Sequence, residues 1–199
     1  MIAALTYSPF AQVPACAGVS GTSIVHTRAV AGTARQWRTP LCELGDRWQA
    51  HSMTIEVRSG PWSSPAIETW LSQTVIPLRL ATSGKQGPLV QSVWFVYDQG
   101  GLWCATQRDS VLAKRVVRDV NVGWEVSPDQ PPYRGVRGSG VATVVDDAAQ
   151  VSSVLDRLVE RYGQSGTTLA QWLLSRIDSE VALCISDLNI TSWDYTPRM

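Results

Sequence analysis

The sequence has very little histidine, and none between Met53 and Met199; the two histidines, His26 and His51, lie upstream. A Ser-His-Asp or Cys-His catalytic arrangement needs an imidazole beside its nucleophile. Many zinc and iron sites also take imidazole ligands. Residues 53–199 therefore cannot build these kinds of site. Any reaction catalysed there must depend on a cofactor or on carboxylates.

Charge of one sign, long apolar runs and clustered cysteines are missing too. The 17 Lys and Arg residues balance the 17 Asp and Glu residues, which disfavours nucleic acid and anionic membranes as partners. No apolar run approaches the roughly 18 residues of a membrane span, and no basic segment opens the chain as in a signal peptide. The four cysteines form no Cys-x-x-Cys pair. We therefore expect a cytoplasmic protein without a metal site, in which Cys104 and Cys184 act as small buried hydrophobic residues.

Residues 1–52 differ from the rest because they show no sustained helix or strand period. Small residues, proline and arginine dominate, while Glu43 and Asp46 are the acidic residues of this segment. This composition predicts a poorly structured N-terminal extension. Two alternatives stay open, namely a translation start at Met53 and a targeting or regulatory arm. We take residues 53–199 as the folded domain.

Strand and helix signals alternate along that domain. Runs rich in β-branched and aromatic residues predict strands at 76–82, 89–97, 101–105, 120–126, 135–146 and 180–193. Helical spacing of apolar residues predicts helices at 63–72, 108–119, 148–162 and 168–176. Val111, Val116 and Val117 are expected to share part of one helix face. Asp98 to Gly101 should be a hairpin turn whose glycines supply positive φ. These elements predict an α+β fold built on an antiparallel barrel.

The loop from Thr106 to Ser110 is a candidate anion site because it leads directly into a helix with Lys114 and Arg115. A phosphate favours backbone donors at a helix N-terminus, short hydroxyl side chains and a nearby cation. The alternative is an ordinary turn in which Asp109 or Ser110 caps the helix and the cations are solvated. The local pattern by itself favours that alternative.

Four short motifs follow one another in this part of the chain. They are Val93-Trp94-Phe95, Asp98-Gln99-Gly100, Ala105 to Ser110, and Pro131 to Arg137. In this order, and with Ser192 to Tyr195 near the end, the chain resembles the pyridoxamine 5'-phosphate oxidase-like family of FMN-binding split barrels. The resemblance covers most of the folded domain.

This resemblance implies a six-stranded antiparallel split β-barrel with peripheral helices. It also implies a homodimer with a cofactor site at each side of the interface. The cofactor would be FMN, with a deazaflavin coenzyme as the alternative. One strand would lie along the isoalloxazine ring, the loop and following cations would hold the phosphate, and a second loop, from the same or the partner subunit, would lie nearby. The implied binding residues are Gln91, Ser92, Val93, Trp94, Thr106, Arg108, Ser110, Lys114, Arg115, Tyr133, Arg134 and Trp193.

One position departs from the family pattern, which often has a lysine two residues after the loop serine. That position is Leu112 here. Either Lys114 and Arg115 substitute with help from Arg108, or phosphate binding is weaker. By the same pattern, Leu112→Lys is expected to strengthen FMN binding. Trp94, Trp103 and Trp124 are expected to be barrel and dimer-core residues rather than ring-stacking partners.

Two functions follow from these observations. The first is a flavin- or deazaflavin-dependent oxidoreductase that transfers a hydride or two electrons to a small molecule of unknown identity. The cofactor would then carry the chemistry, which is compatible with a domain that has no histidine. The second is a non-catalytic dimeric barrel, with or without cofactor, that serves as a sensor or carrier. The departure at Leu112 favours the second.

Overall fold

The structure is a computed structural model, and it describes residues 55–199. The predicted extension at 1–52 and its boundary at Met53 lie outside the described residues. Fourteen elements follow one another in the described part. The strands are β1 (Ile55–Ser59), β2 (Leu78–Thr82), β3 (Leu89–Val93), β4 (Val96–Asp98), β5 (Gly101–Gln107), β6 (Asn121–Val126), β7 (Arg134–Val145) and β8 (Glu180–Asp194). The helices are α1 (Ser64–Gln73), α2 (Val111–Arg118), α3 (Ala148–Arg161), α4 (Thr168–Leu174) and the short 3₁₀ turns η2 (Ile177–Ser179) and η3 (Thr196–Arg198).

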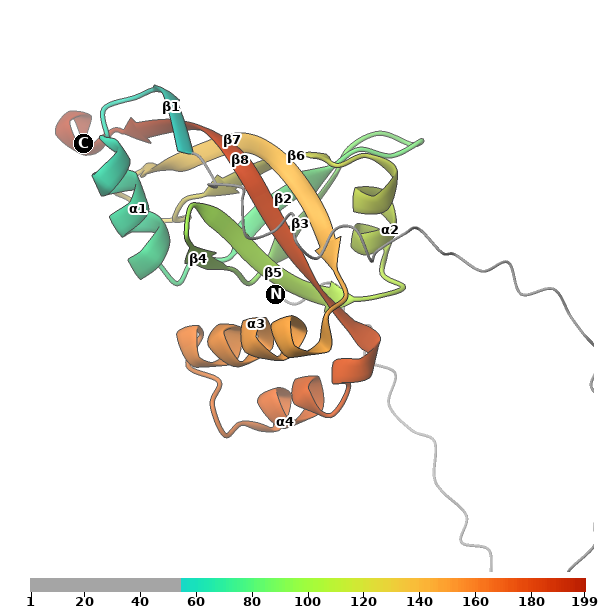
Figure 1. The fold of residues 1–199 in the computed structure, drawn as a ribbon. Coiled ribbons are helices and arrows are strands. Elements are labelled where there is room, and N and C mark those ends of the chain that lie inside the picture. Colours follow the sequence, from blue (N-terminus) through green and yellow to red (C-terminus); the bar gives the residue numbers. More distant parts are fainter. Residues whose placement is uncertain (1–54) are drawn as a thin grey trace, which may run out of the picture. The chain divides into compact units, whose positions relative to one another are not determined.

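All eight described strands belong to one strongly curled sheet, in the order β3-β2-β6-β7-β8-β5-β4, with β1 added parallel to β8 (Figure 1). The other pairings are antiparallel. Helices lie around this half-barrel, so the α+β split-barrel prediction is confirmed. The strand count of six was too low, because β1 was not predicted and because one predicted strand is two.

That divided strand is what curls the sheet. The sequence predicts a single strand over 89–97, but β3 pairs with β2 and β4 pairs with β5, at the two opposite ends of the sheet order. Trp94 and Phe95 carry the chain from one end to the other. Because two residues span only about 7 Å, the two sheet ends must lie close together.

The barrel interior is filled by apolar side chains from the strands and from two helices. Leu78, Leu80, Leu102 and Cys104 are fully buried there. α1 contributes Ile67 and Leu71, and α2 contributes Leu112 and Val116. α2 buries this face rather than the predicted one, since Val111 is 56% exposed and Val117 is 71% exposed. The expectation that these two valines face the core with Val116 was wrong.

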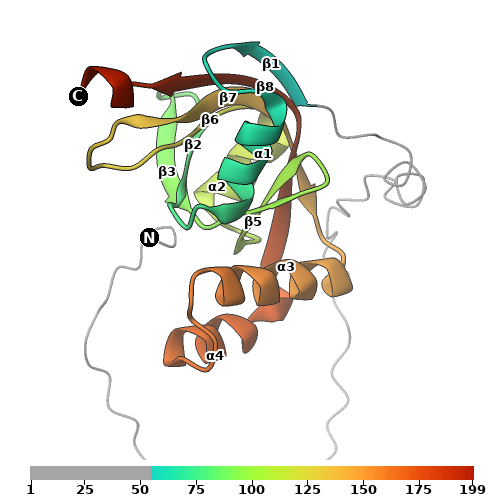
Figure 2. The same cartoon turned by 90° about the vertical axis from the view of Figure 1, so that its left-hand side faces the viewer.

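α3 covers the outer face of β5 and β8, and α4 packs on α3 (Figure 2). Trp103 and Cys184 point outward from the barrel into the cluster beneath α3. β5 is therefore buried on both faces, which explains its unbroken apolar run. Cys104 and Cys184 are free and buried, as expected. Within residues 55–199, no helix combines the length and the apolar character that crossing a membrane requires.

Candidate functional site

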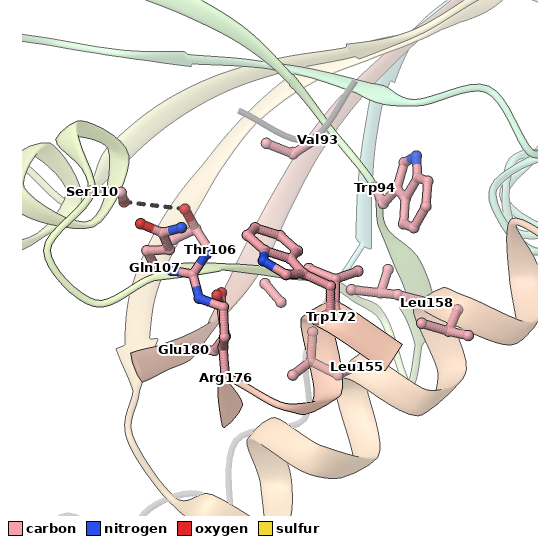
Figure 3. Close-up of a pocket in the computed structure, with 13 residues that line it drawn as sticks. Val93, Trp94, Thr106, Gln107, Ser110, Leu155, Leu158, Trp172, Arg176 and Glu180 are labelled. Atoms are coloured by element: carbon pink, nitrogen blue, oxygen red, sulfur yellow. Dashed lines mark hydrogen bonds between the residues drawn. The ribbon is translucent and has the colours of Figure 1, made fainter. Parts of the chain in front are cut away.

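A pocket lies where the β3–β4 crossing, the end of β5 and the α3–α4 pair meet (Figure 3). Its enclosed part has a volume of about 160 Å³, and it opens to solvent. The apolar wall consists of Val93, Trp94, Ala105, Leu155, Leu158, Val159, Trp172 and Leu173. The polar end consists of Thr106, Gln107, Ser110, Arg176 and Glu180. The pocket thus suits a ligand that has a flat apolar part and a polar or anionic end.

The turn after β5 presents two hydroxyl groups to this pocket. Ser110 caps α2, because its Oγ accepts a hydrogen bond from the Ala113 N–H at 3.0 Å. The Thr106 hydroxyl, on a residue only 7% exposed, donates to the same Oγ at 3.1 Å. The capping role considered for Ser110 is therefore confirmed, and the same residue also lines the pocket.

Trp94 forms part of the pocket wall and also ties α3 to the barrel. Its ring stacks on Tyr162 with centroids 4.7 Å apart and planes 8° from parallel. The Tyr162 hydroxyl accepts from the Phe95 N–H at 3.3 Å and donates to the Ile76 carbonyl at 3.4 Å. Burial raises the pKa of Tyr162, so its hydroxyl keeps its proton. Unlike Trp103 and Trp124, which are buried core residues, Trp94 is a ring-stacking residue at the site.

Arg176 and Glu180 supply the charges of the pocket, and the sequence reasoning missed both. The Arg176 guanidinium lies 4.3 Å from the centre of the Trp172 ring. Glu180 is 4% exposed and pairs across the sheet with Gln107. Burial raises the pKa of the Glu180 carboxyl, and the nearby Arg176 partly opposes that rise. The cross-strand register of β5 and β8 brings them to the loop, and no local sequence pattern announces that register.

The family model for pyridoxamine 5'-phosphate oxidase matches residues 64–183. The chain belongs to this family. The matched range runs from α1 into β8, and therefore includes every residue that lines the pocket. A search of curated protein sequences found no match.

Solved structures with the same fold include three with informative descriptions. The conserved hypothetical protein Rv2991 from Mycobacterium tuberculosis has 24% identity and a TM-score of 0.59, over 68% of this chain and 86% of that one. A protein described as an F420 reductase has 20% identity and a TM-score of 0.52, over 60% and 92%. An FAD-binding protein from Mesorhizobium loti has 15% identity and a TM-score of 0.51, over 66% and 93%. At these identities the similarity establishes the fold.

The family resemblance also named cations around the loop, and in this structure three of them contact other groups or solvent. Arg108 forms an ion pair with Asp146 and donates to the Asp178 carbonyl at 3.4 Å. Arg115 donates to the carbonyls of Thr82 and Gly87, both at 3.1 Å, and so fastens the turn between β2 and β3. Lys114 is exposed on α2. None of the three lines the pocket, and their binding role stays a prediction.

Of the strand expected along the cofactor ring, Val93 and Trp94 line the pocket. Gln91 pairs with the fully buried Leu80, so its side chain faces the barrel interior. Its Oε1 is buried with no hydrogen-bond partner in the described part of the chain. Ser92 points to the opposite, exposed face.

Tyr133, Arg134 and Trp193 lie at the other end of the long β7–β8 ribbon from the pocket (Figure 1). Trp193 pairs with Gly135 and carries the Arg137 guanidinium 5.5 Å above its ring. Arg134 lies over the Trp70 ring, also at 5.5 Å, and Tyr133 is 47% exposed. A single chain does not bring these three residues to the pocket.

Leu112 differs from what the resemblance implied. It is fully buried in the barrel core beside Val116 and does not line the pocket. A lysine here would carry its charge toward apolar neighbours rather than toward a ligand at Thr106. Leucine at 112 is therefore a core residue, and its presence removes no cation from the pocket surface.

Proposed function

We propose that this protein binds a flavin or deazaflavin coenzyme in the pocket beside β3 and α2, and uses it as an oxidoreductase. The observation that carries the proposal is the meeting of Val93 and Trp94 with Thr106 and Ser110 in one cavity. These are four of the residues that the family pattern assigns to ring and phosphate binding. Family membership and the F420- and FAD-related neighbours support the same class of cofactor.

The residues of the pocket fit the two ends of such a cofactor. The Thr106 and Ser110 hydroxyls and the N-terminus of α2 are suitable donors to a phosphate. Trp94, Leu155 and Leu158 offer an apolar surface to a flat ring. The enclosed volume of about 160 Å³ equals only about five water molecules, so most of the cofactor must lie in the open part.

A second copy of the chain would complete the open side of the site. We propose a homodimer in which Tyr133, Arg134 and Trp193 of one subunit approach the pocket of the other. Support comes from their position at the far end of the β7–β8 ribbon, where they cannot serve the pocket of their own chain.

The bound coenzyme would supply two-electron transfer, and the chain would bind and orient it. In this arrangement the hydroxyl pair and α2 hold the phosphate, and Trp94 with the α3 leucines keeps water from one side of the ring. FMN and a deazaflavin are the two candidates, and the reducible small molecule is open. We place the protein in the cytoplasm, where free cysteines such as Cys104 and Cys184 stay reduced.

The proposal is tested by titrating the purified full-length protein separately with FMN and with the deazaflavin coenzyme F420. Micromolar or tighter binding of one of them, followed by turnover with NAD(P)H or an artificial acceptor, is the expected result. Binding without any turnover would favour the sensor or carrier function. If neither coenzyme binds at micromolar concentration, the cofactor assignment is wrong.

A further inference from the structure

The pocket needs a cation if it is to hold a phosphate, and the loop cations do not provide one. Arg108 is paired with Asp146, Arg115 fastens the β2–β3 turn, and Leu112 is in the core. Among the described residues that line the pocket, Arg176 is the one lysine or arginine. It comes from the segment between α4 and η2, far in sequence from the loop it faces.

The surroundings of Arg176 hold it in a defined place. Trp172 is four residues earlier, one helical turn away, and its ring lies 4.3 Å from the guanidinium carbon. The Arg176 N–H donates to the Leu173 carbonyl at 3.2 Å, and the Arg176 carbonyl accepts from the Ser179 N–H at 2.8 Å. Because the backbone is fixed on both sides and the side chain lies on a ring, an ordered guanidinium loses less entropy on binding.

The direction of this side chain points to the same end of the pocket as the hydroxyl pair. Figure 3 shows Arg176 extending from below toward Thr106 and Gln107, with Glu180 beside it. Ser110 and the start of α2 lie beyond Thr106 in the same view. A guanidinium, two hydroxyls and a helix N-terminus thus surround one polar corner of an otherwise apolar pocket. A guanidinium matches phosphate oxygens better than other cationic side chains because its donors form a planar fork.

Glu180 shares the corner and sets a condition on the ligand. It is a buried acid beside Arg176, so the two charges compensate each other when no ligand is bound. An entering anion would compete with the carboxylate for the guanidinium. Arg176 can therefore serve as an anion contact without standing as an uncompensated charge in the free protein.

We propose that Arg176, held on Trp172, binds the phosphate of the coenzyme together with the Thr106 and Ser110 hydroxyls. Arg176 would then decide that the pocket takes a phosphorylated flavin or deazaflavin rather than its phosphate-free form. This inference rests on the proposed function, because it concerns the anionic part of the same ligand.

The test compares ligands with and without phosphate. FMN and riboflavin are titrated against the full-length wild type, Arg176→Gln and Arg176→Lys. If the wild type prefers F420, that coenzyme and its phosphate-free deazaflavin chromophore take their place. The matched control is Arg118→Gln, an exposed arginine in the last turn of α2 that does not line the pocket.

The glutamine variant should bind FMN about 10- to 100-fold more weakly, as expected for loss of a charge-assisted hydrogen bond. Its affinity for riboflavin should match the wild type. The lysine variant should fall between them because it keeps the charge and loses the planar fork. Arg118→Gln should change neither affinity, and thermal unfolding of each variant checks that it is folded.

Two results would overturn the inference while leaving the proposed function in place. One is an unchanged FMN affinity in Arg176→Gln. The other is an equal loss for FMN and riboflavin, which would mean that Arg176 shapes the pocket without contacting phosphate. Failure of the wild type to bind any of these ligands would instead overturn the proposed function, and this inference with it.

Discussion

At the scale of single residues, Ser110 has two roles whose effects are separable. Its Oγ caps α2 and also faces the pocket. Ser110→Ala should lower the free energy of unfolding by about 1 kcal/mol through loss of the cap. It should also weaken FMN binding roughly tenfold if the hydroxyl contacts phosphate. Denaturant unfolding and an FMN titration measure the two effects.

Asp147→Ala is the matched control for that variant. Asp147 caps α3 by accepting from the Gln150 N–H at 2.9 Å, and it does not line the pocket. It should lose similar stability and keep its FMN affinity. Equal losses of affinity in both variants would show that stability alone accounts for the effect.

Glu180 predicts a pH-dependent stability because burial raises the pKa of its carboxyl. Ionising a buried acid opposes folding, so the stability available below its ordinary value of 4.5 is lost as pH rises through the raised value. Glu180→Gln should therefore be more stable than the wild type at neutral pH, with a difference that vanishes in acid. Urea unfolding at about pH 4 and pH 8 measures it. The exposed Glu160→Gln should show no such trend, and the same trend there would discount a specific effect of burial.

Leu112 separates the two expectations about the barrel interior. The family pattern suggests that Leu112→Lys would strengthen FMN binding, but a fully buried position predicts a loss of at least about 3 kcal/mol in folding free energy. Leu112→Met, which keeps volume and polarity, should cost less than about 1.5 kcal/mol. A stable lysine variant with tighter FMN binding would show that this position faces the ligand.

At the scale of elements, the β3–β4 crossing explains what the sequence could not predict. The run 89–97 is continuously rich in apolar and β-branched residues, and nothing in it signals that its halves pair at opposite ends of the sheet. The hairpin turn was predictable, since Gly100 has a φ of +83°, although Gln99 with φ +48° takes the other positive-φ position. The buried face of α2 was mispredicted because Leu112 was assigned to the site instead of the core.

The Tyr162 hydroxyl should stabilise that crossing by about 1 to 2 kcal/mol, because it bonds both Phe95 and Ile76. Tyr162→Phe removes these bonds and keeps the ring that stacks on Trp94. Denaturant unfolding should reveal the loss. Tyr195→Phe, at a residue that is 48% exposed, should change stability by less than about 0.5 kcal/mol. Equal effects in the two variants would argue against a specific role for the crossing.

At the scale of the whole molecule, the fold class could be read from motif order, while the pocket could not. Thr106 and Ser110 were predictable as loop hydroxyls at a helix start. Arg176 and Glu180 reach the same corner through the β5–β8 register and the α4–η2 segment, which no local pattern encodes. Tyr133, Arg134 and Trp193 lie away from the pocket of their own chain, and a homodimer is the arrangement that would use them.

The dimer predicts a solution mass of twice the chain. Sedimentation equilibrium of the full-length protein should give twice 21.7 kDa at micromolar concentration. Tyr133→Ala combined with Trp193→Ala should lower cofactor affinity while thermal unfolding still shows a folded protein. A strictly monomeric protein that binds FMN with wild-type strength in this double variant would exclude a shared site.

The central claim is that one pocket of this chain binds a flavin-type coenzyme by its ring and its phosphate. A crystal structure of the full-length protein with bound FMN or F420 tests it most directly. The ring should lie against Val93 and Trp94, and the phosphate should lie between Ser110 and Arg176. A coenzyme bound elsewhere on the barrel, or a phosphate that contacts neither residue, would contradict the claim.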